Sequence, residues 1–147
     1  MLADLIRRFT APPSTAPLPT EDARLALAAL MVRLARSDGS YSATEQSQIE
    51  RALAAFHDLG PDAAATLRRD AEVAEQSAPD TVQFTRLIKA AVPYEEREEV
   101  IEALWRVALA DGIDASERSF LRLVANLVGV SDRDSGFARQ RAQSARG

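Results

Sequence analysis

Apolar residues recur every three or four positions along most of this chain, which is the spacing of amphipathic α-helices. From residue 20 onward, each such stretch is bounded by a glycine, a proline or a capping residue, the usual marks of helix ends. Short polar turns connect the stretches. The pattern predicts an all-α protein that folds as a compact bundle of about seven helices.

The first nine residues form a separate amphipathic stretch. Its apolar side chains, Leu2, Leu5, Ile6 and Phe9, share one helical face, and two arginines lie opposite them. Residues 10–19 are rich in proline, which removes backbone donors and breaks a helix. We expect the apolar face to dock on the domain itself, and contact with a partner or a membrane surface stays open as an alternative.

Composition fits a single domain. At 147 residues the chain can bury a sizeable core without disulfides, and it has no cysteine. We expect a short helix and linker at residues 1–19, the helical domain at 20–138 and a basic flexible tail at 139–147.

A net charge of −4 argues against nucleic acid as a partner. No apolar run is long enough for a bilayer span, so we expect a cytoplasmic protein.

Two parts of the chain share one pattern: a long helix, an Asp-Gly pair, a short loop and a capping box at the next helix. The Asp-Gly pairs are Asp38-Gly39 and Asp111-Gly112, and the capping boxes are Ser42 with Glu45 and Asp114 with Glu117. In a capping box the first side chain accepts a backbone amide of the helix, and the glutamate reaches back to the amide of the capping residue. We interpret the two parts as pseudo-repeated helix–turn–helix hairpins that pack against each other.

The aspartates of the two turns carry a charge that needs an explanation. Each follows the carbonyl end of a helix, where the helix dipole disfavours a negative charge. Each side chain can bond the amides beyond it in an Asx turn, or it can hold a hard cation, Ca²⁺ or Mg²⁺, together with other oxygen ligands. The candidate metal ligands are Asp38, Glu45, Asp111, Asp114 and Glu117. Because capping alone accounts for the two glutamates, both explanations stay open.

At the two Ala-x-x-Asp-Gly strings, residues 35–39 and 108–112, and at the glutamates that follow them, the chain resembles the TerB-like family. This family is named for tellurite resistance and is also related to the N-terminal domain of a DnaJ-like co-chaperone. The resemblance covers about residues 20–132. It implies an all-α pseudo-repeat, a role in stress response and metal-ion resistance, and divalent metal at the acidic turns. The first turn has Tyr41 and Ser42 where the second turn has an acid, so it offers fewer carboxylates. The chain also lacks the His-Pro-Asp triplet of a J-domain, so we do not transfer the chaperone activity.

The sequence holds no phosphate-binding loop, Walker motif or nucleophile elbow, so we expect no enzyme. His57 is the only histidine, and we expect it at the C-terminus of a helix, where the dipole favours it. The expected function is a non-enzymatic, metal-responsive interaction module that binds a protein partner. The alternative is a divalent-metal (Ca²⁺ or Mg²⁺) binding or sequestering protein linked to tellurite resistance. A homodimer formed through the N-terminal helix also stays open.

Overall fold

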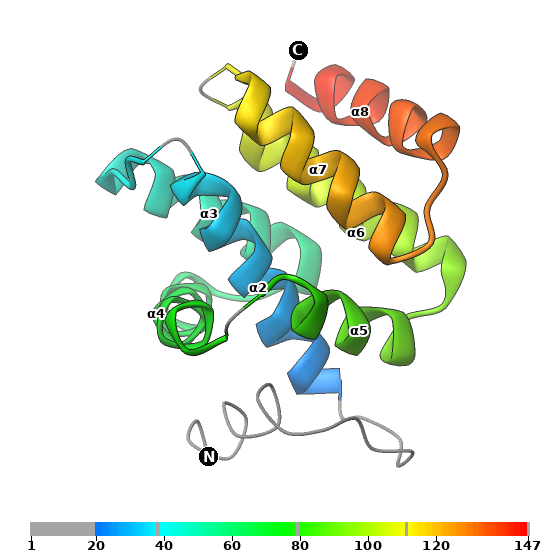
Figure 1. Cartoon of the computed structure of the whole chain (residues 1–147). Helices are drawn as coiled ribbons and strands as arrows, with labels where there is room; N and C mark the ends of the chain where they lie inside the picture. The colour runs from blue at the N-terminus through cyan, green and yellow to red at the C-terminus, as the bar shows by residue number, and fades with distance from the viewer. Residues whose placement is uncertain (1–19, 38, 79, 111, 147) are drawn as a thin grey trace.

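The computed structural model describes residues 20–37, 39–78, 80–110 and 112–146. Within these residues it contains seven α-helices and no strand, which confirms the predicted all-α bundle (Figure 1). The helices are α2 (Thr20–Arg36), α3 (Ala43–His57), α4 (Pro61–Ser77), α5 (Val82–Ala91), α6 (Tyr94–Leu109), α7 (Ala115–Leu127) and α8 (Asp132–Arg146). The helix expected at residues 1–9 lies outside the described residues. None of the described helices has the length and apolar character needed to cross a membrane.

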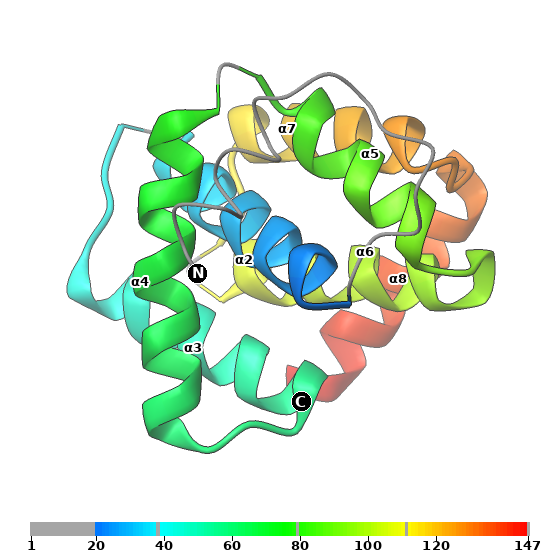
Figure 2. The ribbon, with the colours of Figure 1, turned by 90° about the horizontal axis from the view of Figure 1, so that it is seen from below.

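Helix α2 is the centre of the bundle. Every residue from Leu25 to Val32 is buried, and α2 contacts α3, α4, α5, α6 and α7. Figure 2, seen from below, shows α2 enclosed by these five helices. Leucine and alanine occupy all sides of this stretch, and a helix that is apolar all round is stable only when it is buried.

Helix α8 packs along α6 and extends further than the sequence pattern predicts. Ala138 and Ala142, which lie one turn apart, are both fully buried. The helix continues to Arg146. Residues 139–146, expected as part of a basic tail, are therefore helical and belong to α8. These small residues give a weak hydrophobic signal in the sequence, and polar contacts add to them: Ser135 accepts from Trp105 Nε1 at 3.2 Å and Arg141 pairs with Glu102 at 2.6 Å.

The pair Gly60-Pro61 predicts that one helix ends at the glycine and the next begins at the proline, and the turn between α3 and α4 differs from this in part. Asp58, with φ of 54°, ends α3 in the left-handed conformation. Gly60 has an extended conformation and precedes Pro61, the first residue of α4. The sequence correctly predicts proline at the start of α4, but it is wrong in assigning the end of α3 to Gly60. Aspartate is one of the few residues other than glycine that adopts the left-handed region at modest cost.

Candidate functional site

The long helices α2 and α6 are each followed by a glycine in the left-handed conformation. Gly39 has φ of +88° and Gly112 has φ of +81°. The Gly39 amide donates to the carbonyl of Arg36 at 3.0 Å, and the Gly112 amide donates to the carbonyl of Leu109 at 3.4 Å. A side chain would strain the backbone at both positions. The glycine of each Asp-Gly pair therefore lets the chain turn out of its helix, and it partly satisfies the carbonyl end of that helix.

Both predicted capping boxes are present. At the start of α3, the Glu45 amide donates to Ser42 Oγ at 3.1 Å, and the Ser42 amide donates to Glu45 Oε1 at 2.9 Å. At the start of α7, the Glu117 amide donates to Asp114 Oδ1 at 2.8 Å, and the Asp114 amide donates to Glu117 Oε1 at 3.2 Å. Each box fixes the position of two side chains relative to the backbone of its helix.

The two turns, far apart in the sequence, open on one pocket of about 540 Å³. We call it the turn pocket. It is lined by Ala35, Ser40, Ser42, Glu45 and Gln48 from the first turn, and by Val107, Ala108, Gly112, Ile113, Asp114 and Glu117 from the second. Ala35 and Ala108, the first residues of the two matching strings, are buried and form part of its floor. The pocket thus combines an apolar floor with hydrogen-bonding walls.

Every charged residue in the lining of the turn pocket is acidic. Glu45 comes from the first turn, and Asp114 and Glu117 come from the second. Each glutamate uses its Oε1 atom in a capping box, and a carboxylate has lone pairs for more than one donor. The structure therefore brings three of the predicted site residues to one pocket, with no positive side chain among its described lining residues.

Two of the five candidate metal ligands, Asp38 and Asp111, lie outside the described residues. Among the residues with a described placement, no three histidine, aspartate or glutamate side chains form a group that could hold a metal ion. The proposed five-residue metal site and the pseudo-repeat of the hairpins both stay predictions. What the structure describes of the two turns is their shared glycine conformation and their capping geometry.

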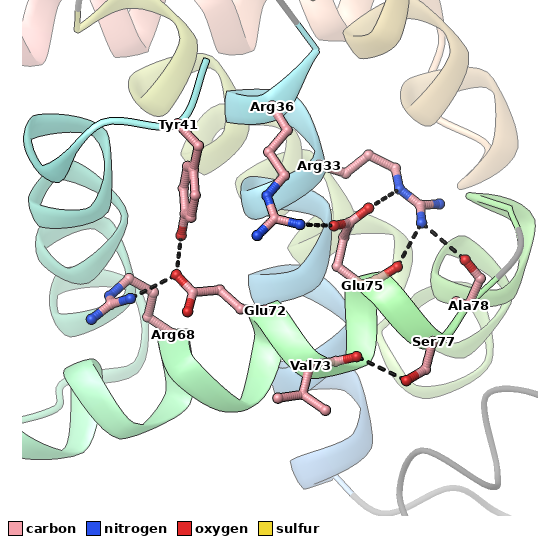
Figure 3. Close-up of polar contacts among 9 residues, drawn as sticks. All are labelled: Arg33, Arg36, Tyr41, Arg68, Glu72, Val73, Glu75, Ser77 and Ala78. Atoms are coloured by element: carbon pink, nitrogen blue, oxygen red, sulfur yellow. Dashed lines mark hydrogen bonds and ion pairs between the residues drawn. The ribbon is translucent and has the colours of Figure 1, made fainter. Parts of the chain in front are cut away.

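Tyr41 is not among the described lining residues of the turn pocket, and its side chain ties the first turn to α4 (Figure 3). Its hydroxyl donates to Glu72 Oε2 at 2.6 Å, and Arg68 Nη1 donates to the same oxygen at 2.7 Å. Arg68 Nε also pairs with Glu50 of α3 at 2.6 Å. Burial, followed by the nearby Glu72 carboxylate, raises the pKa of the Tyr41 phenol above its ordinary value. Tyr41 therefore remains a neutral hydrogen-bond donor at physiological pH.

A second polar group joins the end of α4 to α2. Glu75 accepts from Arg33 Nε at 3.0 Å and from Arg36 Nη1 at 2.8 Å, so its carboxylate lies between the two arginines (Figure 3). Arg33 Nη2 also donates to the backbone carbonyls of Glu75 and Ala78, at 2.9 and 3.1 Å. Because the last carbonyls of a helix lack partners within it, Arg33 caps the C-terminus of α4.

Sequence reasoning missed several residues of the turn pocket. Ser40, Gln48 and Ile113 line it, yet none of them was singled out. The sequence does contain a signal that Gln48 lies near the predicted site: it follows Glu45 by three positions and therefore shares the same face of the helix. Ile113 takes the place next to Gly112 and packs against the core, which the spacing alone does not reveal.

Comparison with known protein families identifies a match over most of the chain. The family model described as tellurite resistance protein TerB matches residues 24–140, which is most of the chain and includes both turns. No curated protein and no solved structure matches.

Proposed function

The chain belongs to the TerB family, and on that premise we propose that it is a non-enzymatic binding module of the tellurite and metal-ion stress response, whose turn pocket takes a cationic group of a protein partner. The single observation that carries this proposal is the charge of the pocket. Its described charged residues, Glu45, Asp114 and Glu117, are all acidic and come from both turns. The charged group of a lysine or arginine side chain has only hydrogen-bond donors, and carboxylates gathered in one pocket supply acceptors and the opposite charge.

The geometry of the walls supports binding to a fixed site. The two capping boxes hold the acidic side chains through backbone hydrogen bonds, so little side-chain entropy remains to be lost when a ligand binds. The buried floor, with Ala35, Val107 and Ala108, offers apolar contact to the aliphatic stem of a basic side chain.

Site-specific photo-cross-linking tests whether the turn pocket contacts a protein partner. A photoreactive benzoylphenylalanine is placed at Gln48, in the wall of the pocket, or at Gln76, an exposed glutamine on α4 that is not among the lining residues. The protein is irradiated in cells exposed to tellurite. We expect a cross-linked product of defined mass from position 48 and none from position 76. Equal products from both positions, or none from position 48, would contradict the proposal.

A second candidate is a divalent cation, Ca²⁺ or Mg²⁺, in the same pocket. The specific observation in its favour is that the described charged residues of the lining are all carboxylates, whose oxygen atoms hard cations prefer. Glu45, Asp114 and Glu117 do not by themselves form a metal-holding group, so this candidate also needs the aspartates of the two turns. Asp38 and Asp111 would complete the ligand set proposed from the sequence.

Calorimetry distinguishes the two candidates. Titration of metal-free protein with Ca²⁺ and with Mg²⁺ is expected to give a dissociation constant on the order of 10⁻⁴–10⁻³ M, as in weak oxygen-ligand sites. Asp114→Asn should weaken that binding at least about tenfold, equal to about 1.4 kcal/mol. Asp132→Asn, an exposed acid on α8, serves as the control and should leave it unchanged. Absence of heat at millimolar ion, or equal heat in Asp114→Asn, would rule out the cation.

A further inference from the structure

A second, larger pocket lies at the opposite end of α2 from the turns. We call it the basal groove. It has a volume of about 640 Å³ and lies among the first turns of α2 and α6 and the last turns of α3 and α5. Figure 2 views the molecule from the side on which α2 begins. The floor includes Leu27, Ile88 and Val100, which are all buried core residues.

Several of the helices contribute alanines to the walls of the basal groove, beside larger side chains such as Phe56 and Val92. Ala52 and Ala55 come from α3, Ala91 from α5 and Ala103 from α6. Small residues allow the backbone of another helix to approach closely. An apolar floor between alanine walls is therefore a shape that accepts the apolar face of a short helix.

One edge of the basal groove is acidic. Glu96 and Glu99 of α6 are exposed, and neither side chain has an ion pair or hydrogen bond with another residue that the structure describes. Glu102, further along α6, is already paired with Arg106 and Arg141. Among the described lining residues, the carboxylates without a described partner are thus Glu96 and Glu99, and the basic residues are Arg24 and Arg106.

His57 does not add to the positive charge of the groove. It lies in the last turn of α3, as expected from the sequence, and its Nε2 atom is buried without a hydrogen-bond partner. Burial, and secondly the charge of Arg24, lowers the pKa of His57 to about 4. The imidazole is therefore neutral at physiological pH, because desolvation outweighs the favourable helix dipole expected there.

We propose that residues 1–9 of the same chain occupy the basal groove, with Leu2, Leu5 and Ile6 on its floor and the arginines of the segment at its acidic edge. The segment has the required chemistry, since one face is apolar and Arg7 and Arg8 are adjacent to it in the sequence. Long arginine side chains can extend from the outer face of a helix to charges at the edge of a groove. This proposal does not depend on the function proposed for the turn pocket.

The connection between the segment and the groove supports binding within one chain. Residues 10–19 join the segment to α2, and Ala23 and Arg24 of the first turns of α2 already line the groove. Ten residues span at most about 33–36 Å. A helix of 15 residues such as α3 is about 22 Å long, so the connection can reach either end of the groove. A short tether also gives an effective concentration on the order of millimolar.

Because the chain has no cysteine, disulfide trapping tests the proposal without background. Leu5→Cys is combined with Ala55→Cys in the basal groove. The matched control combines it with Ala63→Cys, an exposed position in a neighbouring pocket that also includes Arg24. We expect an intrachain disulfide to form at least tenfold faster with position 55 than with position 63. Equal rates would contradict docking in the basal groove, and a disulfide-linked dimer whose yield rises with protein concentration would contradict docking within one chain.

Charge reversal provides the second measurement. In the Leu5→Cys and Ala55→Cys background, Arg7→Glu with Arg8→Glu should slow trapping about tenfold, and Glu96→Arg with Glu99→Arg should restore most of the rate. The changes are at exposed positions or in the segment itself, so circular dichroism should show an unchanged helical content. A rate that does not respond to either pair of substitutions would overturn the electrostatic part of the proposal.

Discussion

The two turns share their local chemistry and differ in what holds them to the rest of the molecule. Each has a left-handed glycine and a complete capping box. The first turn is fixed by a polar contact, from Tyr41 to Glu72 of α4. The second turn has no tyrosine, and its Ile113 packs against the core, as the Tyr41 ring also does. Both turns are therefore held by apolar packing, and the first is held in addition by the hydrogen bond from Tyr41 to Glu72.

This difference changes the charge that each turn supplies to the pocket they share. The first turn has one extra residue, and its capping residue is the neutral Ser42, so it contributes a single described carboxylate, Glu45. The second turn uses Asp114 as its cap and contributes two. We infer that the first turn serves mainly to join α2, α3 and α4, whereas the second supplies most of the binding charge. The predictions below test this division, from the largest expected effect to the smallest.

Loss of the arginine that caps α4 should have the largest effect on stability. Arg33→Met removes one hydrogen bond to the Glu75 carboxylate and two to backbone carbonyls. It leaves the Glu75 side chain, which is only 13% exposed, with fewer partners. We expect a loss of about 2–4 kcal/mol in the free energy of unfolding, measured with urea. The control, Arg122→Met, removes an exposed ion pair of 3.6 Å between α7 and α8 and should cost less than about 0.5 kcal/mol. Similar losses in both variants would contradict the special role of the α2–α4 contact.

Removal of the tyrosine hydroxyl tests the anchor of the first turn directly. Tyr41→Phe leaves the ring and removes the hydrogen bond to the Glu72 carboxylate, so we expect a loss of about 1–2 kcal/mol. The matched control is Tyr94→Phe, which removes a hydrogen bond of similar length, 2.7 Å, to Asp134. Because the Tyr94 hydroxyl is less deeply buried than that of Tyr41, its loss should be smaller. A larger loss for Tyr94→Phe would mean that the first turn does not depend on its polar anchor.

The capping boxes should contribute equally in the two turns. Ser42→Ala and Asp114→Ala each remove a side chain that accepts a backbone amide, and each should cost about 1 kcal/mol. Asp114→Asn keeps an acceptor and should cost only a few tenths of a kcal/mol. Thermal unfolding of the three variants is the measurement, and a loss for Asp114→Asn as large as that for Asp114→Ala would show that the charge itself is needed for folding.

Mild acid should weaken the fold through His57 rather than through either turn. The pKa of His57 is about 4 in the folded protein and about 6.5 when unfolded, so protons bind preferentially to the unfolded chain between these values. Stability should therefore be constant above pH 7 and fall as the pH decreases from 6.5 toward 4, by about 0.5–1 kcal/mol at pH 5 after allowance for partial exposure. His57→Gln should remove this decrease between pH 7 and 5. If it does not, the acid sensitivity lies elsewhere, and the turns become the next candidates.

The local parts of the site could be predicted from the sequence because they depend on neighbours in the chain. Both capping boxes involve residues three positions apart, and the glycines mark helix ends by their own conformational freedom. The buried faces of the helices followed from their spacing for the same reason. The central position of α2 was not predicted, because its apolar residues were interpreted as one face of an amphipathic helix, whereas the structure buries them on all sides.

The parts that depend on tertiary structure could not be predicted. The hydroxyl of Tyr41 meets Glu72 from 31 positions away, and no spacing rule connects them. The same limit applies to Ser40 and Ile113, which share a pocket only because the two turns lie side by side. The end of α3 was misplaced because glycine is the usual residue in the left-handed position, whereas here Asp58 adopts it.

The most direct test of the shared acidic pocket is the yield of the photo-cross-link from position 48 in the Asp114→Asn variant. Position 48 lies on the first turn's helix, while Asp114 caps the helix after the second turn. If the two turns form one site for a cationic group, the substitution should reduce the yield at least fivefold while the unfolding temperature changes little. An unchanged yield in a fully folded variant would contradict the assignment of the binding charge to the second turn.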